Sequence, residues 1–310
     1  MPLTAHPVAR GASLIVAGMA AIGFIDNFVW VIAAEVSVWQ FHLVRSAVAL
    51  PALALAATLG LRLRPNRPGR VALRAAVQGA AMLLYFASLG FLPIAQVGAG
   101  LFTAPLFVLL LAALLFRERI GPRRLAAVAA GFAGVLLILR PDPATMGAEA
   151  LMPLAAGALY GLSNLLTREW CADEPVGALL AAFFAALGLI GAAGCLVLAL
   201  HPAAGPATFL TAPWATPSAL ALGWIAAQAF GSLAAFGLVT RGYQFAAAST
   251  LSVFEYSFLI SASLWAFVLR GETLDAAGAL GIALIIASGI IVAAAPPRPL
   301  APGAAAQDPG

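Results

Sequence analysis

Ten apolar stretches of about twenty residues follow one another along the chain, separated by short polar segments. They lie at 12–33, 39–60, 71–90, 94–116, 122–140, 151–169, 176–199, 219–240, 246–269 and 275–294. Each is long enough to cross the ~30 Å hydrocarbon core of a bilayer as a helix. The pattern therefore predicts an all-α membrane protein with ten transmembrane helices in the lipid bilayer.

The second half of this pattern repeats the first. Residues 104–139 hold two apolar runs around a tight basic turn, and residues 258–292 hold the same arrangement 154 positions later, which aligns Glu118 with Glu272. Each half has five stretches, an odd number, so the second half must enter the membrane upside down. We expect a cytoplasmic N-terminus at 1–11, a first repeat at 12–140, an inverted second repeat at 141–294 and a disordered cytoplasmic tail at 295–310. Inverted repeats are typical of secondary transporters.

Composition agrees with a polytopic membrane protein, because 63% of the residues are hydrophobic and 9% are charged, against about 25% charged in soluble domains. The net charge of +4 does not indicate a nucleic-acid partner, since the arginines lie between the apolar stretches. Two cysteines, Cys171 and Cys195, cannot form a metal cluster. Three scattered histidines make neither a metal site nor a catalytic triad. We expect no metal, no cofactor and no enzyme activity.

The arginines also predict the orientation. With a cytoplasmic N-terminus, 13 of the 16 arginines lie in inside segments, whereas Arg140 and Arg270 lie outside and Arg45 lies within a helix. This bias predicts that both termini are cytoplasmic. The first apolar stretch could be taken for a signal peptide, but Asp26 and Asn27 interrupt it and no small-residue cleavage site stands out. We interpret it as a retained helix.

Glu255 is the most informative polar residue within the membrane. It is about nine residues into the ninth stretch, roughly 14 Å from the cytoplasmic edge and so near the midplane. A charge at that depth usually faces a cavity or a partner. The side chain is a candidate substrate or proton site, and the alternative is a structural hydrogen bond to a neighbouring helix. Its counterpart in the first half is Leu101, so the two halves are chemically different at this position.

Asp26 and Arg45 form a second candidate pair, nearer the outside. Both lie at similar depth on adjacent stretches. They are either an ion pair that fixes the first two helices or an outer gate that recognises a charged solute. Asn27 and Trp30 flank the same region, and Asp26 and Trp30 are four residues apart, as a carboxylate and an aromatic would be around a cation.

Other polar residues near the midplane complete a predicted aromatic-lined cavity. Singly, each is an interhelical hydrogen-bond partner as readily as a ligand contact. The candidate substrate or proton-binding residues are Glu255, Tyr256, Ser252, Tyr85, Tyr160, Asn164, Gln228, Asp26, Asn27, Trp30 and Arg45. Outside this set, Glu118 and Glu272 are expected to cap the fifth and tenth helices, where a negative charge complements the N-terminal dipole.

Short motifs in both halves resemble the EamA repeats of the drug/metabolite transporter superfamily. In the first half these are Tyr85-Phe86-Ala87 followed by Leu92-Pro93, then Pro105 with a run ending at Glu118, and finally Gly131 and Gly134; in the second half Glu272, Gly281 and Gly289 mirror them. The first stretch departs from the family pattern. Many members have a Trp at the position of Phe24, three before Asn27, and Asp26 is an added acid.

The resemblance covers about residues 12–294 and implies a ten-helix transporter in a bacterial inner membrane. It also implies that the fifth and tenth helices are candidates for a homodimer contact. The stretch Val38-Trp39-Gln40 leading to Arg45 resembles a branch labelled S-adenosylmethionine-uptake-like.

Taken together, these features predict a secondary transporter of a small polar organic metabolite, amino-acid-like and cationic or zwitterionic, that works by alternating access. Proton coupling and exchange both remain open as modes. A non-transporting membrane scaffold or sensor is one alternative, and it predicts no flux. An intramembrane enzyme is the other, and it would need paired carboxylates or a histidine cluster at one depth, which the sequence lacks.

Overall fold

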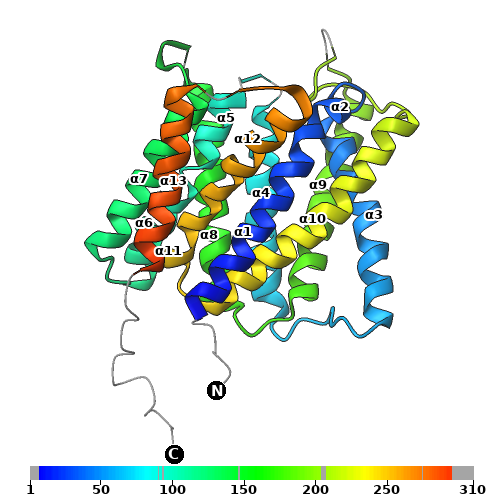
Figure 1. The fold of residues 1–310 in the computed structure, drawn as a ribbon. Coiled ribbons are helices and arrows are strands. Elements are labelled where there is room, and N and C mark those ends of the chain that lie inside the picture. Colours follow the sequence, from blue (N-terminus) through cyan, green and yellow to red (C-terminus); the bar gives the residue numbers. More distant parts are fainter. Residues whose placement is uncertain are drawn as a thin grey trace, which may run out of the picture.

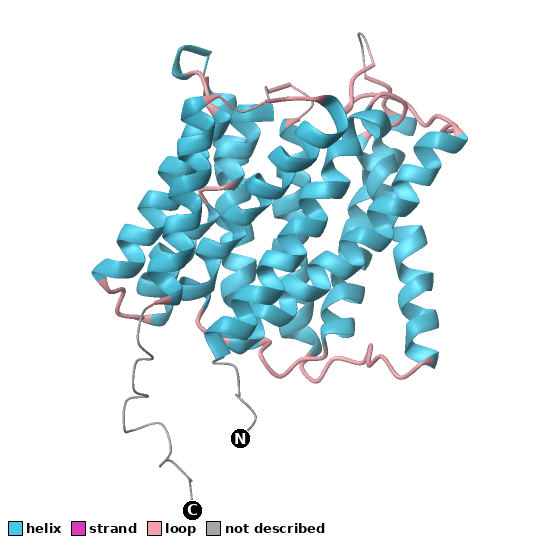
Figure 2. Cartoon of the chain, viewed as in Figure 1, coloured by secondary structure: helices cyan, strands magenta, loops and turns pink. Residues whose placement is uncertain are grey.

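The computed structural model describes residues 7–89, 91–92, 94–145, 147–203, 207–273 and 275–294, and within these ranges every regular element is a helix (Figures 1 and 2). The first half contains α1 (Pro7–Ile25), η1 (Asp26–Phe28), α2 (Val29–Ala33), α3 (Val38–Thr58), α4 (Pro68–Ser88), α5 (Ile94–Leu101), α6 (Ala104–Phe116) and α7 (Pro122–Leu139). Next come η2 (Pro143–Thr145), η3 (Ala148–Ala150), α8 (Leu151–Trp170), α9 (Val176–Leu200), α10 (Ala219–Phe245), α11 (Ala248–Leu251), η4 (Ser252–Tyr256), α12 (Ser257–Arg270) and α13 (Ala276–Ala293).

These elements make ten spans that are long and apolar enough to cross a membrane, as the apolar pattern predicts. Span 1 joins α1, η1 and α2, span 4 joins α5 and α6, span 6 joins η3 and α8, and span 9 joins α11, η4 and α12; the other spans are single helices. The protein is thus an all-α, multi-pass membrane protein. The tail at 295–310, predicted to be disordered, lies outside the described residues, as do the first six residues of the segment at 1–11.

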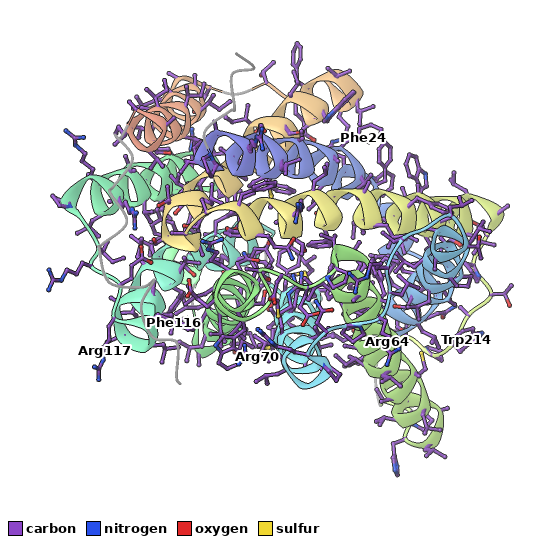
Figure 3. The ribbon with its side chains drawn as sticks, turned by 90° about the horizontal axis from the view of Figure 1, so that it is seen from below. Phe24, Arg64, Arg70, Phe116, Arg117 and Trp214 are labelled. Carbon is purple, nitrogen blue, oxygen red and sulfur yellow. The ribbon has the colours of Figure 1, made fainter. Side chains whose placement is uncertain are left out.

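Helix α1 begins and helix α13 ends at the same face of the bundle, which we call the terminal face (Figure 1). Loops 59–67, 117–121 and 171–175 lie on this face, and the basic side chains Arg64, Arg70 and Arg117 belong to its loops and helix starts (Figure 3). Segments 34–37, 140–145 and 271–273 lie on the opposite face, which we call the distal face.

Prolines and short polar side chains set the helix starts. Helices α4, α6 and α7 carry proline in their first turn, where the missing N–H is not needed. Ser37, Ser218 and Asp275 cap α3, α10 and α13 by accepting a hydrogen bond from the backbone N–H three residues ahead.

The expected capping by Glu118 and Glu272 is wrong. Helix α7 begins at Pro122 after an N-cap Gly121 with no side-chain cap, and Asp275 caps α13. Both glutamates lie three or more residues before these helices and bind arginine instead: Glu118 pairs with Arg124, and Glu272 accepts from the Nε of Arg270 at 2.5 Å.

The two halves, each of five spans, pack so that the helix pairings are kept when one half is exchanged for the other. Helix α1 packs along α10 and α12, and correspondingly α8 packs along α4 and along α5 and α6. Helices α3 and α9 pair with each other, as do α7 and α13, which form one edge of the bundle in Figure 1. Exchanging spans 1–5 with spans 6–10 therefore turns each of these pairings either into itself or into another of them.

The α7–α13 pair is close because glycines meet at its crossing. A Cβ atom on Gly134 would lie 2.5 Å from the carbonyl oxygen of Gly281, and a Cβ atom on Gly281 would lie 2.7 Å from that of Gly134. Small residues of this kind let membrane helices approach backbone to backbone. Arg140 and Asp275 form an ion pair at the distal ends of the two helices.

Three spans are interrupted near the middle of the bundle. Span 1 narrows to a 3₁₀ turn at Asp26, span 4 breaks after Leu101, and span 9 winds as a 3₁₀ turn through Glu255. The last two breaks are about 154 residues apart, so they are repeat equivalents. Irregular backbone at membrane depth is tolerated where it is buried in protein or lines a cavity, and all three breaks border the cavity described next.

Candidate functional site

A central cavity of about 70 Å³ lies between the two halves, with room for a few water molecules. Its walls are mainly apolar and aromatic, and a few polar side chains point into it. The lining residues are Met19, Ile22, Ile25, Asp26, Arg45, Met82, Tyr85, Phe86, Leu101, Phe102, Tyr160, Gln228, Ser232, Phe236, Glu255 and Phe258. Apolar walls with a small number of convergent polar groups are the usual composition of a small-molecule site.

A wider vestibule of about 480 Å³ adjoins the cavity. The two spaces share Asp26, Tyr85, Phe86, Phe102 and Phe258, so they are continuous. The remaining wall of the vestibule includes residues from helix ends at the distal face, among them Trp30, Leu139 and Arg270. The path into the cavity therefore opens toward the distal face.

Glu255 lies at the other end of the cavity, held by two neighbouring helices. Its Oε1 accepts hydrogen bonds from Asn164 Nδ2 of α8 and from the Tyr243 hydroxyl of α10, both at 2.8 Å. The side chain is 2% exposed. Tyr160 lies beside the same carboxylate. Glu255 therefore both lines the cavity and joins α8 to α10 beneath it.

A second polar layer joins α4 to the same two helices, α8 and α10. Arg74 of α4 donates from Nε to the Thr167 hydroxyl at 2.9 Å and from Nη2 to the Thr240 hydroxyl at 3.2 Å. Thr167 follows Asn164 by three residues on α8, and Thr240 precedes Tyr243 by three on α10, so the same helix faces supply both layers. Arg74 is 1% exposed and is the largest fully buried side chain among the described residues.

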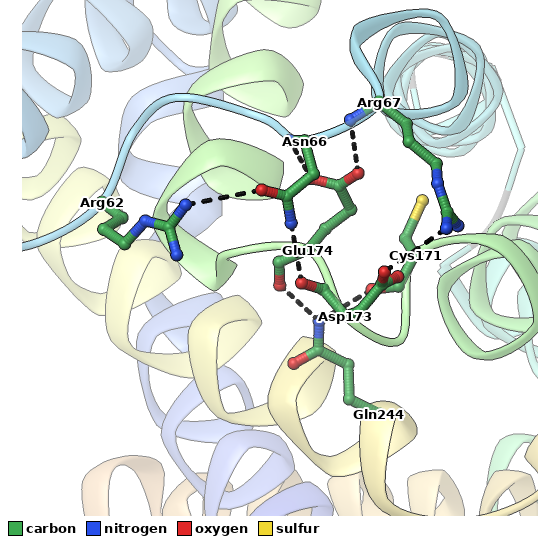
Figure 4. Close-up of polar contacts among 7 residues, drawn as sticks. All are labelled: Arg62, Asn66, Arg67, Cys171, Asp173, Glu174 and Gln244. Carbon is green, nitrogen blue, oxygen red and sulfur yellow. Dashed lines mark hydrogen bonds and ion pairs between the residues drawn. The ribbon is translucent and has the colours of Figure 1, made fainter.

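A third layer closes the terminal face itself (Figure 4). Gln244 Nε2 donates to the carbonyl oxygens of Cys171 and Glu174, at 2.9 and 2.8 Å. The Glu174 carboxylate accepts the backbone N–H groups of Asn66 and Arg67, both at 2.7 Å, and so caps the start of α4 from another loop. We call these three layers the terminal ladder; its side chains are Asn164, Glu255, Tyr243, Arg74, Thr167, Thr240, Gln244 and Glu174.

The distal face has a counterpart of the Glu174 cap. Glu35, in the loop after span 1, accepts the backbone N–H and the hydroxyl of Ser218, both at 2.7 Å, at the start of α10. Exchange of the two halves relates α10 to α4, so each half contributes one glutamate that caps a helix of the other half. These hydrogen bonds lower the pKa of Glu35 below its usual value.

Asp26 and Arg45 face the cavity from its distal end, without a direct ion pair between these two described residues. Asp26 Oδ1 accepts a hydrogen bond from Gln228 Nε2 at 3.2 Å, and the same nitrogen donates to the carbonyl oxygen of Ile25 at 3.0 Å. The predicted alternative of an ion pair that fixes spans 1 and 2 is therefore wrong for this structure.

The structure brings together six of the predicted site residues on the cavity wall: Asp26, Arg45, Tyr85, Tyr160, Gln228 and Glu255. Two more, Asn27 and Trp30, line the vestibule. Asn164 is placed behind the wall and holds Glu255.

Ser252 and Tyr256 are not among the residues that line either space. The Tyr256 ring packs against Gly131 of α7 and near Phe102, within the apolar cluster that includes α7 and α13. The Ser252 hydroxyl is buried without a hydrogen-bond partner. Because span 9 winds as a 3₁₀ turn here, only Glu255 of this stretch reaches the cavity.

Sequence reasoning missed Arg74 and Tyr243. Arg74 was counted among the arginines of the inside segments, although it lies within the third apolar stretch, 71–90, and α4 carries it into the bundle. The signal was present: Arg74 shares the buried face of α4 with Val71, Ala75 and Gln78. Tyr243 was missed because the eighth stretch was ended at residue 240, whereas α10 continues to Phe245.

The fold and the site thus define a polytopic membrane protein with a solute-sized path that is open at one face. Residues 9–140, which hold the first five spans, match the model of the EamA-like transporter family. The first half of the chain is thus similar to the EamA-like transporter family, and relatives of the chain are named transporters.

Three relatives illustrate the likeness. A riboflavin transporter of Rhizobium johnstonii is 36% identical over 138 residues, which cover 44% of this chain and 44% of that protein. The chain thus aligns with less than half the length of this relative. An uncharacterized transporter of Helicobacter pylori is 26% identical over 288 residues, covering 91% and 94% of the two chains. A solved crystal structure matches the fold with a TM-score of 0.72 at 21% identity, covering 90% and 95%. The S-adenosylmethionine-uptake-like branch stays a prediction.

Proposed function

We propose that this protein is a secondary transporter that moves a small organic solute through the central cavity by alternating access. The observation that carries the proposal is a cavity, walled by both halves and lined by Asp26, Arg45 and Glu255, that is open toward one face and closed by hydrogen bonds toward the other. A path of this kind serves transport, because it exposes a central site to one side at a time.

In this proposal the terminal ladder is the inner gate. To release solute at the terminal face, α8 and α10 must separate from α4 and η4, which breaks the hydrogen bonds of Arg74 and Glu255. Interhelical hydrogen bonds in membrane proteins average about 0.6 kcal/mol. A ladder of such bonds can therefore hold one face closed, and thermal motion can still break the bonds and open that face. With a cytoplasmic N-terminus, the vestibule faces outward and the ladder faces the cytoplasm of a bacterial inner membrane.

Two solute classes fit the lining. Two acids and one arginine favour an amino-acid-like solute, cationic or zwitterionic, because carboxylates attract an ammonium group. The aromatic side chains of the path favour a flat ring solute instead: Trp30, Tyr85, Phe86, Phe102, Phe209 and Phe258. The riboflavin named for some relatives belongs to this second class.

Glu255 is the proposed coupling residue if transport is driven by protons. It is the ionisable group that both lines the cavity and holds the ladder, so a proton on its carboxyl group weakens the acceptor that Asn164 and Tyr243 share. Protonation and opening of the terminal face are then linked. Exchange without an ion is the other mode of the same path.

A ligand screen followed by a flux measurement tests the proposal. Purified protein is screened by thermal shift against amino acids, nucleosides, polyamines, sulfonium compounds and riboflavin; a ligand at a hundred times its Kd stabilises the fold by about 2.7 kcal/mol. Each hit is then measured by counterflow in proteoliposomes. We expect protein-dependent accumulation of at least one hit. A complete lack of flux, together with alanine variants of the cavity residues that change stability alone, supports a membrane scaffold or sensor instead.

The Glu255→Gln variant tests the coupling. We expect it to lose uptake driven by a pH gradient while counterflow continues, because a glutamine cannot carry the proton. Glu149→Gln is the matched control, since Glu149 lies in η3 outside the path. Full transport with full pH dependence in Glu255→Gln would rule out the proton role.

We also propose that a homodimer, if one forms, uses the lipid-facing sides of α7 and α13. Their facing sides are occupied by each other within one chain, which leaves residues such as Leu125, Leu136, Leu280 and Ile286 exposed on their outer sides. Crosslinking of single cysteines on these outer sides, in membranes, tests this contact.

A further inference from the structure

One face of α3 carries three buried polar residues whose hydrogen-bonding capacity is incomplete. His42, Arg45 and Ser46 lie three or four residues apart, and their exposed fractions are 0, 2 and 1%. His42 Nε2, Arg45 Nε and Ser46 Oγ have no hydrogen-bond partner. Of the three, Arg45 is the one that lines the cavity.

The guanidinium of Arg45 is held in place by rings rather than by an acid. Its central carbon lies 4.7 Å from the Phe41 ring centroid, 5.7 Å from that of Phe86 and 5.8 Å from that of Phe184. Its Nη2 lies 3.3 Å from His42 Nδ1. The described carboxylates form no ion pair with it. The group is thus fixed in position while donors of its five-donor fork remain free.

This arrangement calls for an acceptor from the solute. A buried guanidinium with unpaired donors is expensive. A planar guanidinium matches a carboxylate by two parallel hydrogen bonds, and it can also donate to a single carbonyl oxygen. Asp26, which lines the same cavity, supplies the complementary acceptor for a donor group of the solute. The cavity wall therefore presents a donor side and an acceptor side.

We propose that Arg45 recognises a planar acceptor group of the solute, a carboxylate or an imide carbonyl, while Asp26 takes an adjacent N–H donor. This inference rests on the proposed function and narrows it, because a solute with a cationic group alone leaves Arg45 unsatisfied. Arg45 is then a specificity-determining residue, and the aromatic wall of the cavity carries the body of the solute.

Paired ligands that differ in one group test this directly. Binding to the purified full-length chain is measured by thermal shift and calorimetry for tyrosine against tyramine, and for riboflavin against its 4-thio derivative, in which a weakly accepting sulfur replaces a carbonyl oxygen; acetate is the minimal acceptor probe. We expect at least a tenfold tighter Kd for the member of one pair that keeps the acceptor group. The tyrosine pair reports a carboxylate, and the flavin pair reports an imide.

Variants of Arg45 then separate recognition from packing. Arg45→Gln is expected to bring the Kd ratio within the responsive pair close to one, and Arg45→Lys, which keeps the charge but loses the planar fork, is expected to retain part of it. A purely structural arginine would lower the melting temperature in both variants without changing the ratio. If Arg45→Gln does not fold, Arg45→Lys carries the same comparison.

Each outcome decides something. Equal binding of both members of each pair, an unchanged ratio in the variants, or no Arg45-dependent shift with any probe including acetate overturns the inference. Transport of a solute without an acceptor group overturns it while leaving the proposed function intact. Acceptor discrimination without any flux overturns the proposed function and leaves this inference intact, because Arg45 then recognises a ligand in a protein that does not transport it.

Discussion

The distal and terminal halves of the path differ in the side chains that form them. The distal half is walled by aromatic and apolar side chains, with polar groups such as Asp26, Asn27 and Arg270 set among them. The terminal half is closed by layered hydrogen bonds through Arg74 and Glu255. The difference teaches that polar side chains close the path where they are paired across helices, and line an open space where they face the cavity.

The Arg74→Leu substitution is expected to have the largest effect on this contrast. It removes both hydrogen bonds of the middle layer, and hydrogen bonds to charged groups contribute about 1.5–3 kcal/mol. Cys171 reports on the result, because it is buried beneath Gln244 and burial raises the pKa of its thiol, which slows alkylation at neutral pH. We expect maleimide labelling of Cys171 to rise more than tenfold in a Cys195→Ala background. Unchanged labelling would show that this layer does not hold the terminal face.

Glu174→Gln is expected to have a smaller effect on the same reporter. Each carboxylate oxygen of Glu174 accepts one backbone N–H, whereas glutamine has a single acceptor oxygen, so one of the two bonds is lost. Labelling of Cys171 should rise by less than in Arg74→Leu. Glu35→Gln is the matched control at the distal face. In this variant, Cys171 should be labelled at the wild-type rate. Equal effects of the two substitutions would contradict the separation of the two halves.

Trp30→Ala should affect the distal half alone. Trp30 lines the vestibule and is 67% exposed, so its removal changes the packing little. An exposed cation–aromatic contact contributes about 0.5–1 kcal/mol, and we therefore expect a two- to fivefold weaker Kd for a cationic or zwitterionic solute, measured by calorimetry. Cys171 labelling and the melting temperature should match those of the wild type.

Asp275→Asn should have the smallest effect. The Arg140 side chain and the Gly278 N–H lower the pKa of Asp275 to about 2. A lowered pKa means that the ionised carboxylate stabilises the fold in full above its usual value of 3.8, and that this stabilisation is lost as the pH falls through 2. Melting temperatures should differ slightly between the variant and the wild type at neutral pH and less at high salt. A difference that persists unchanged in 1 M salt would contradict an electrostatic origin.

Much of this architecture could be predicted from the sequence. Apolar length alone locates all ten spans, because membrane helices must satisfy their backbone internally over a fixed thickness. The same logic identifies Asp26, Arg45 and Glu255, since charged residues in apolar stretches need a cavity or a partner. The structure places all three around the same cavity.

The remaining features depend on helix ends and local winding, which periodicity does not fix. Arg74 was missed because it was counted with the inside segments, although it lies in the third apolar stretch. Tyr243 was missed because α10 continues to Phe245, beyond its apolar stretch. Tyr256 was predicted to line the site with Glu255, but the 3₁₀ turn directs it toward α7. Glu118 and Glu272 failed as caps because a proline start and Asp275 serve those helices instead.

Arg74 has one more consequence, which concerns the insertion of the protein into the membrane during synthesis. If the terminal face is cytoplasmic, as the arginine distribution predicts, Arg74 near the start of span 3 counts, before the helices assemble, toward the positive charge that retains a loop on the side of synthesis. After assembly the same side chain is withdrawn from water and bonded to Thr167 and Thr240. On that prediction, Arg74 first helps to orient span 3 during membrane insertion and later helps to close the terminal face. Substitutions of Arg74 are therefore best checked for orientation before they are interpreted as gating defects.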